Sequence, residues 1–151
     1  MRAEWDKDMD IDEMMLQGIC LKKLLEKKMT PLMQEYGLRP VELDILFFLD
    51  MQKGVDTARE LIRTRHLSKA HISKSVDNLR KRGFITLMED GEDHRLMHIR
   101  CTERAKEAAA RVRSVYQECQ NIVMKDITAE EYCQMEIVLG KIRRNVEREL
   151  D

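Results

Sequence analysis

Apolar residues recur at helical spacing through the first part of the chain. Between residues 11 and 36 they fall three or four positions apart, which predicts one long helix. Pro31 lies inside this segment, and because proline lacks an amide hydrogen it predicts a kink or break over residues 27–31. Gly37 predicts the end of the helix, since glycine readily adopts the left-handed conformation that closes many helices.

Two further helices are predicted before residue 66. Pro40 suits the first turn of a helix that runs to about residue 49, and this segment is apolar on nearly all sides, so we expect it to be buried. Thr57 and Glu60 have the spacing of a capping box, in which each side chain satisfies the other's backbone amide. They predict a short third helix over residues 57–65.

A fourth helix is predicted from about Ser68 to Arg82, with Ser68 as its N-cap and Gly83 at its end. Its apolar stripe is narrow, so a broad polar face should be exposed. Such side chains can hydrogen-bond to phosphates and to base edges. That face comprises Lys69, Ala70, His71, Ser73, Lys74, Asp77, Asn78 and Lys81.

The pattern changes to strand-like after the fourth helix. Residues 84–88 and 96–101 flank a polar turn at residues 89–93, which predicts a two-stranded hairpin. Helical spacing then returns over residues 102–125, and a second capping box, Thr128 and Glu131, opens a last helix. The predicted fold class is mainly α with a small β-hairpin, a winged helix-turn-helix core flanked by N- and C-terminal helices.

Charge is distributed unevenly along the chain. The formal net charge is −1, but residues 59–82 hold eight Lys or Arg against two acidic residues, a local charge of +6. The other 127 residues therefore sum to −7. This segregation concentrates positive potential near the fourth helix, where it can attract a polyanion. Since a helix fits the major groove of B-DNA and a hairpin can reach the adjacent backbone or minor groove, we interpret the segment as a DNA-binding element.

Four short motifs support this interpretation, in order and at consistent spacing. Residues 37–42 are similar to a G-L-T-P-x-Q helix start, with Arg39 in place of Thr and Glu42 in place of Gln. Residues 67–85 contain a V-D-x-L-x-x-x-G pattern, residues 93–95 a D-x-R pattern, and residues 101–105 are similar to L-T-x-x-G. With these motifs the chain resembles the multiple-antibiotic-resistance-regulator (MarR) family of bacterial transcription factors.

The resemblance implies a homodimeric, sequence-specific repressor of transcription. Residues 1–36 and 102–151 would form the dimerisation lobe and residues 37–101 the DNA-binding lobe, with one fourth helix in each half-site of a palindromic operator on double-stranded DNA. It also implies that Arg95 of the wing enters the minor groove and that Asp93 orients it. The predicted DNA contacts are Ser68, Lys69, Ala70, His71, Ser73, Lys74, Asn78, Lys81 and Arg95, of which Ser73, Lys74 and Asn78 are expected to read bases.

Two features leave alternatives open. The wing carries Glu89, Asp90, Glu92 and Asp93, which would repel phosphates, so its contact with DNA is less secure than that of the helix.

Family members respond to small lipophilic or phenolic molecules or to cysteine oxidation. Methionines 14, 15, 29, 33 and 51 could line an effector pocket, although core packing is the simpler explanation. A redox-sensing regulator or a winged-helix protein-interaction module is the alternative.

Other functions find little support. The four cysteines are widely spaced, and Cys20 reads most simply as a buried structural thiol. His94 and His98 would stand roughly 13 Å apart along a strand, so we expect no metal site. The sequence contains no catalytic motif and no cofactor-binding loop, so we expect no enzyme activity and no cofactor. No apolar run is long enough to cross a membrane, and without a signal peptide we expect a cytoplasmic protein.

Overall fold

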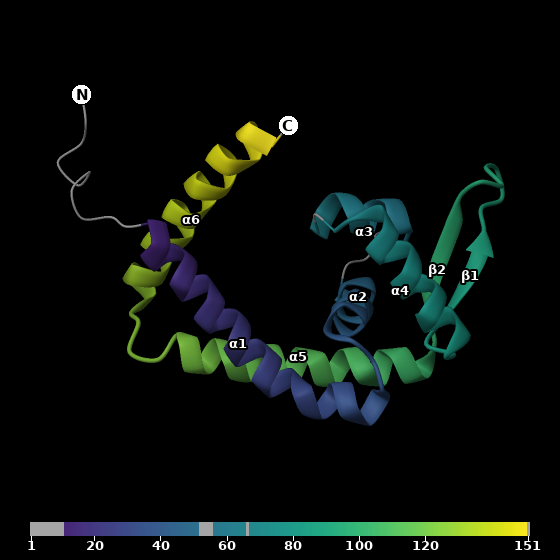
Figure 1. The fold of residues 1–151 in the computed structure, drawn as a ribbon, viewed down its shortest axis with the longest axis horizontal. Helices are drawn as coiled ribbons and strands as arrows, with labels where there is room; N and C mark the ends of the chain where they lie inside the picture. Colours follow the sequence, from purple (N-terminus) through teal and green to yellow (C-terminus); the bar gives the residue numbers. More distant parts are fainter. Residues whose placement is uncertain (1–10, 52–55, 66, 151) are drawn as a thin grey trace. The chain divides into compact units, whose positions relative to one another are not determined.

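The structure is a computed structural model that describes residues 11–51, 56–65 and 67–150, drawn in colour in Figure 1. The chain divides into two compact units, Met1–Cys119 and Gln120–Asp151. The first unit contains helices α1 (Ile11–Tyr36), α2 (Pro40–Met51), α3 (Ala58–Arg65) and α4 (Lys69–Lys81), strands β1 (Ile85–Glu89) and β2 (Met97–Cys101), and most of α5 (Glu103–Val123). The predicted order of elements and the predicted fold class are confirmed.

Helix α1 continues without a break through Pro31. The predicted break is therefore wrong, and the alternative of a kink stays a prediction. Met29 and Leu32, which flank the proline, are both buried in the core, and their packing outweighs the single backbone hydrogen bond that Pro31 removes. The predicted end at Gly37 is confirmed, with φ +62° and a hydrogen bond from the Leu38 amide to the Met33 carbonyl that closes the last turn.

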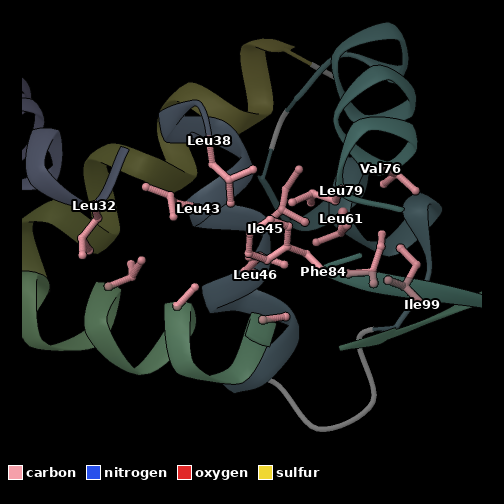
Figure 2. Packing of buried hydrophobic residues seen from close by; sticks show 14 of the residues in the cluster. Leu32, Leu38, Leu43, Ile45, Leu46, Leu61, Val76, Leu79, Phe84 and Ile99 are labelled. Carbon is pink, nitrogen blue, oxygen red and sulfur yellow. The ribbon is translucent and has the colours of Figure 1, made fainter. Parts of the chain in front are cut away.

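Residues from α1, α2, α3, α4, the hairpin and α5 share one hydrophobic core, part of which is shown in Figure 2. Phe84, Leu43 and Leu79 are fully buried at its centre. Helix α2 is half-buried or buried along almost all of its length, as its apolar sequence predicts. This core fixes α4 against α2, α3 and β1, and it leaves the opposite side of α4 exposed.

The hairpin pairs β1 with β2 in antiparallel register, with Leu87 opposite Ile99 and Glu89 opposite Met97. The predicted strands are confirmed with a shift of about one residue at their starts. The polar segment between them forms the tip, closed by a hydrogen bond from the Asp90 amide to the Leu96 carbonyl.

The second unit, Gln120–Asp151, consists of the last turn of α5, a connecting turn and helix α6 (Ala129–Leu150). The predicted capping box at the start of α6 is confirmed, because the Glu131 amide donates to the Thr128 hydroxyl and the Thr128 amide to the Glu131 carboxylate. Helix α6 has no buried residue in this single chain. Among the described residues, no helix combines the length and apolar character needed to cross a membrane.

Candidate nucleic-acid interface

Helix α4 begins and ends at the predicted residues. The hydroxyl of Ser68 accepts a hydrogen bond from the His71 amide at 3.2 Å, which satisfies one free donor of the first turn. At the other end, Gly83 has φ +77°, and the Phe84 amide donates to the Leu79 carbonyl. Both signals are local in sequence, and they set the length of the exposed helix.

One face of α4 is solvent-exposed and the other enters the core. Ile72, Val76 and Leu79 are buried, as is Ser75. Asp77 and Asn78 are half-buried. The remaining predicted contacts on this helix are exposed: Ser68, Lys69, Ala70, His71, Ser73, Lys74 and Lys81.

A buried carboxylate links α4 to the start of α2. Glu42 is fully buried and accepts hydrogen bonds from the backbone amide, Nε and Nη2 of Arg39 and, at 2.8 Å, from Nδ2 of Asn78. Burial on its own would raise the pKa of Glu42, but the hydrogen bonds from Arg39 and Asn78 outweigh it and the pKa is lowered. Glu42 is therefore ionised, and the Asn78 amide nitrogen is held by it in the free protein.

Arg39 also borders the exposed face of α4. A shallow groove of about 340 Å³ is lined by Arg39, Lys74, Asp77, Asn78 and Lys81. Asp77 forms ion pairs with Lys81 at 2.6 Å and with Arg80 at 3.2 Å. The helix-turn-helix surface therefore includes a cation from outside α4, which the sequence prediction omitted.

The wing is held to α3 by a histidine placed between two aspartates. His98 Nδ1 lies 2.9 Å from Asp56 Oδ2, and its Nε2 lies 2.8 Å from Asp90 Oδ1. The hydrogen bonds with Asp90 and Asp56 raise the pKa of His98 above its ordinary value. The hydrogen bond from His98, together with the amides of Asp93 and Glu92, lowers the pKa of Asp90 to about 2. These contacts fix the hairpin tip relative to the start of α3.

The wing tip presents Arg95 beside several acidic residues. Arg95 is exposed, and its backbone amide donates to Asp93 Oδ1 at 3.0 Å. Asp93 thus contacts the main chain of Arg95. Two acidic side chains of the tip already contact histidines, since Asp90 binds His98 and Glu89 lies 3.1 Å from His94 Nδ1. Among the described residues, no three His, Cys, Asp or Glu side chains gather in a way that could hold a metal ion.

A separate pocket of about 140 Å³ lies between α1, α2 and α5 within the first unit. Its polar wall contains Asp44, which accepts a hydrogen bond from the hydroxyl of Tyr116. Burial raises the pKa of Asp44, and burial together with this hydrogen bond raises the pKa of Tyr116. The pocket is lined by Lys22, Leu25, Glu26, Met29, Pro40, Asp44 and Tyr116.

The methionines and cysteines give mixed outcomes. Of the five methionines considered as pocket lining, Met29 lines this pocket and Met33 packs against the core, while Met14, Met15 and Met51 are exposed. Cys20 is exposed rather than buried, because it lies on the part of α1 beyond the core. Burial raises the pKa of Cys101 and of Cys119, which keeps both thiols protonated.

Two helices joined by a short connection, the second with an exposed basic face and followed by an antiparallel hairpin, define a winged helix-turn-helix protein. The model of the MarR family matches residues 36–96, which cover these elements. Over its winged helix-turn-helix elements the chain is thus similar to the MarR family, whose members are transcriptional regulators and not enzymes.

Individual relatives agree over most of the chain. The transcriptional repressor MprA of Escherichia coli strain K12 is 25% identical over an alignment of 145 residues, which covers 93% of this chain and 82% of MprA. A MarR-family regulator from Listeria monocytogenes, solved with a 26mer DNA, superposes with TM-score 0.81 at 16% identity, covering 95% of this chain and 91% of that one. The organohalide-sensing regulator RdhR, solved in its 2,4-dichlorophenol-bound form, superposes with TM-score 0.70 at 20% identity. The superposition covers 96% of this chain and 86% of RdhR. The two structural likenesses establish the fold.

Proposed function

We propose that this regulator binds double-stranded DNA sequence-specifically as a homodimer and represses transcription until a small molecule releases it. The exposed basic and polar face of α4 carries the proposal, because it offers side chains suited to major-groove edges on a helix that the core holds rigidly. The Listeria relative with bound DNA supports the nucleic-acid partner, and MprA supports repression. Access to chromosomal DNA is consistent with the expected cytoplasmic location.

Exposed apolar residues support a dimer. The first half of α1 leaves Ile11, Met15 and Ile19 exposed, with 71% of Ile11 accessible. In the second unit, α6 exposes a series of large apolar side chains that none of the described residues buries. Apolar surface of this extent is costly in water and marks an interaction surface. The series on α6 comprises Met135, Ile137, Val138, Leu139, Val146 and Leu150.

The pocket beside Asp44 and Tyr116 is the proposed effector site. Apolar side chains make up much of its wall, and a few polar groups can orient a ligand, which is the usual composition of a small-molecule site. Its volume of about 140 Å³ suits a small lipophilic or phenolic molecule. The 2,4-dichlorophenol bound by RdhR is a compound of this class.

The proposal is tested by titrating duplex DNA from upstream of the protein's own coding sequence at several salt concentrations, with and without phenolic compounds or peroxide. We expect affinity to fall steeply with salt and to fall further when an effector is added. Lys74→Ala should weaken binding, whereas Lys125→Ala, an exposed lysine outside α4, serves as the matched control. Salt-sensitive binding to a protein and none to any duplex would favour an interaction module instead. Release by peroxide rather than phenols would favour a redox regulator.

A further inference from the structure

Among the described residues that line the α4 groove, Arg39 is the one cation that α4 does not supply. It directly precedes α2, yet it lines the same groove as Lys74 and Lys81. Of the groove's lining residues, these three are positively charged and Asp77 is negatively charged, and the buried Glu42 that binds Arg39 adds a second negative charge, which leaves an excess of one positive charge. Asp77 is already paired with Lys81 and Arg80. The groove therefore has positive potential at the edge of the surface that α4 presents.

The Arg39 side chain is held in one orientation. Its Nε and Nη2 donate to Glu42 Oε1 at 3.1 and 2.8 Å, and Nη2 also lies 3.3 Å from the Ser75 hydroxyl. Glu42 in turn is fixed by the Arg39 backbone amide and by Asn78. A guanidinium held by a buried carboxylate loses little further side-chain entropy when it binds a second anion.

Part of this guanidinium stays available. The Arg39 side chain is 46% exposed, and none of the hydrogen bonds among the described residues uses its Nη1. An arginine with one edge held by a carboxylate can donate from its remaining nitrogen to a phosphate oxygen. Because Arg39 lies beside α4 rather than on it, its guanidinium is placed to contact the phosphate backbone of DNA that borders the major groove.

We propose that Arg39 binds a DNA backbone phosphate next to the segment read by α4, and that Glu42 is the residue that positions it. The inference rests on the proposed function, since it requires α4 to lie in the major groove. The contact is independent of sequence, so it adds to affinity for every duplex and to the dependence of affinity on salt. Because the negative charge of ionised Glu42 balances the positive charge of Arg39, the pair has no net charge. Arg39 can still direct a hydrogen-bond donor at the phosphate.

The test compares salt dependence across matched variants. The double variant Arg39→Thr/Glu42→Gln removes the cation and the buried carboxylate together, which leaves the net charge unchanged and no charge unpaired. Thr and Gln are also the residues usual at these positions in the G-L-T-P-x-Q pattern. We expect the slope of log affinity against log salt to become shallower by about 1.8 in a dimer that loses one phosphate contact per subunit.

Two single variants distinguish this from a structural effect. Glu42→Gln keeps the cation and should keep a slope as steep as that of the wild type or steeper. Arg39→Lys keeps the charge and should also keep the slope, with affinity reduced because lysine lacks the fork that binds Glu42. Thermal unfolding followed by circular dichroism verifies that each variant is folded.

The outcomes separate this inference from the proposed function. A wild-type protein that binds no duplex overturns the proposed function. Wild-type binding with an unchanged slope in the folded double variant overturns the role of Arg39 alone. In the double variant, lower affinity at an unchanged slope would likewise assign Arg39 a purely structural role and overturn the inference.

Discussion

The imidazole Nε2 of His98 lies 2.8 Å from the Asp90 carboxylate, while the other ring nitrogen lies 2.9 Å from Asp56. Both ring nitrogens can donate at once when the ring is protonated. The raised pKa of His98 stabilises the folded wing below the ordinary histidine value of 6.5, and this contribution is lost as pH rises through the folded value. The lowered pKa of Asp90 contributes above the ordinary 3.8 and is lost as pH falls to about 2.

We therefore predict that wing amides, the Ile99 amide among them, are better protected from hydrogen exchange at pH 5.5 than at pH 8.5, after correction for intrinsic rates. In His98→Gln this difference should disappear, because glutamine does not titrate. His94→Gln is the control, since that histidine is 80% exposed at the wing tip. Persistence of the difference in His98→Gln would assign it to other groups.

The sequence predicts that Lys74 and Asn78 both read bases, and the structure gives the two side chains different surroundings. Asn78→Ala removes a donor to the buried Glu42 and should cost about 1 kcal/mol of unfolding free energy in addition to any effect on operator choice. Lys74→Ala should leave stability within about 0.5 kcal/mol of the wild type and reduce discrimination between operators. Chemical denaturation and competition binding measure the two effects. Equal stability of the two variants would refute the distinction.

Ser68 and Ser73 provide a second matched pair on α4. Ser68→Ala removes the N-cap that accepts the His71 amide and should cost about 1 kcal/mol in stability. Ser73→Ala changes an exposed hydroxyl outside the cap and should alter operator affinity with little change in unfolding. Denaturant titrations of both variants test this expectation, which fails if Ser73→Ala is the less stable of the two.

Arg95→Ala should weaken operator binding and leave the preference among operator sequences intact. One phosphate or minor-groove contact fewer per wing should reduce the salt slope by about one for each subunit. Asp93→Asn is the companion variant, because it keeps an oxygen that can accept from the Arg95 amide while it removes one charge from the acidic tip. If Arg95→Ala binds with wild-type affinity and salt dependence, the wing makes no contact with DNA.

Features encoded by neighbouring residues could be predicted from the sequence. Ser68, Gly83 and the capping boxes at Thr57 and Thr128 act over three or four positions, and the helix boundaries that they predict are confirmed. The break at Pro31 was wrong because buried neighbours decide whether a proline interrupts a helix, and burial is set by the whole core.

Contacts between residues far apart in the sequence could not be predicted from the spacing of apolar, polar and charged residues alone. Asn78 and Glu42 are 36 positions apart, and His98 is 42 from Asp56. The replacement of Thr by Arg39 and of Gln by Glu42 was visible as two departures from one motif. Opposite charges at three-residue spacing were the signal that could have identified them as a pair. The division into dimerisation and DNA-binding lobes remains a prediction.

Arg82 follows the last residue of α4, and its guanidinium donates to the carbonyl oxygens of Tyr36, at 2.9 Å, and Gly37. These two hydrogen bonds connect the end of α4 to the end of α1. Helix α1 also lines the pocket beside Tyr116, so the proposed effector site and the end of α4 are attached to the same helix.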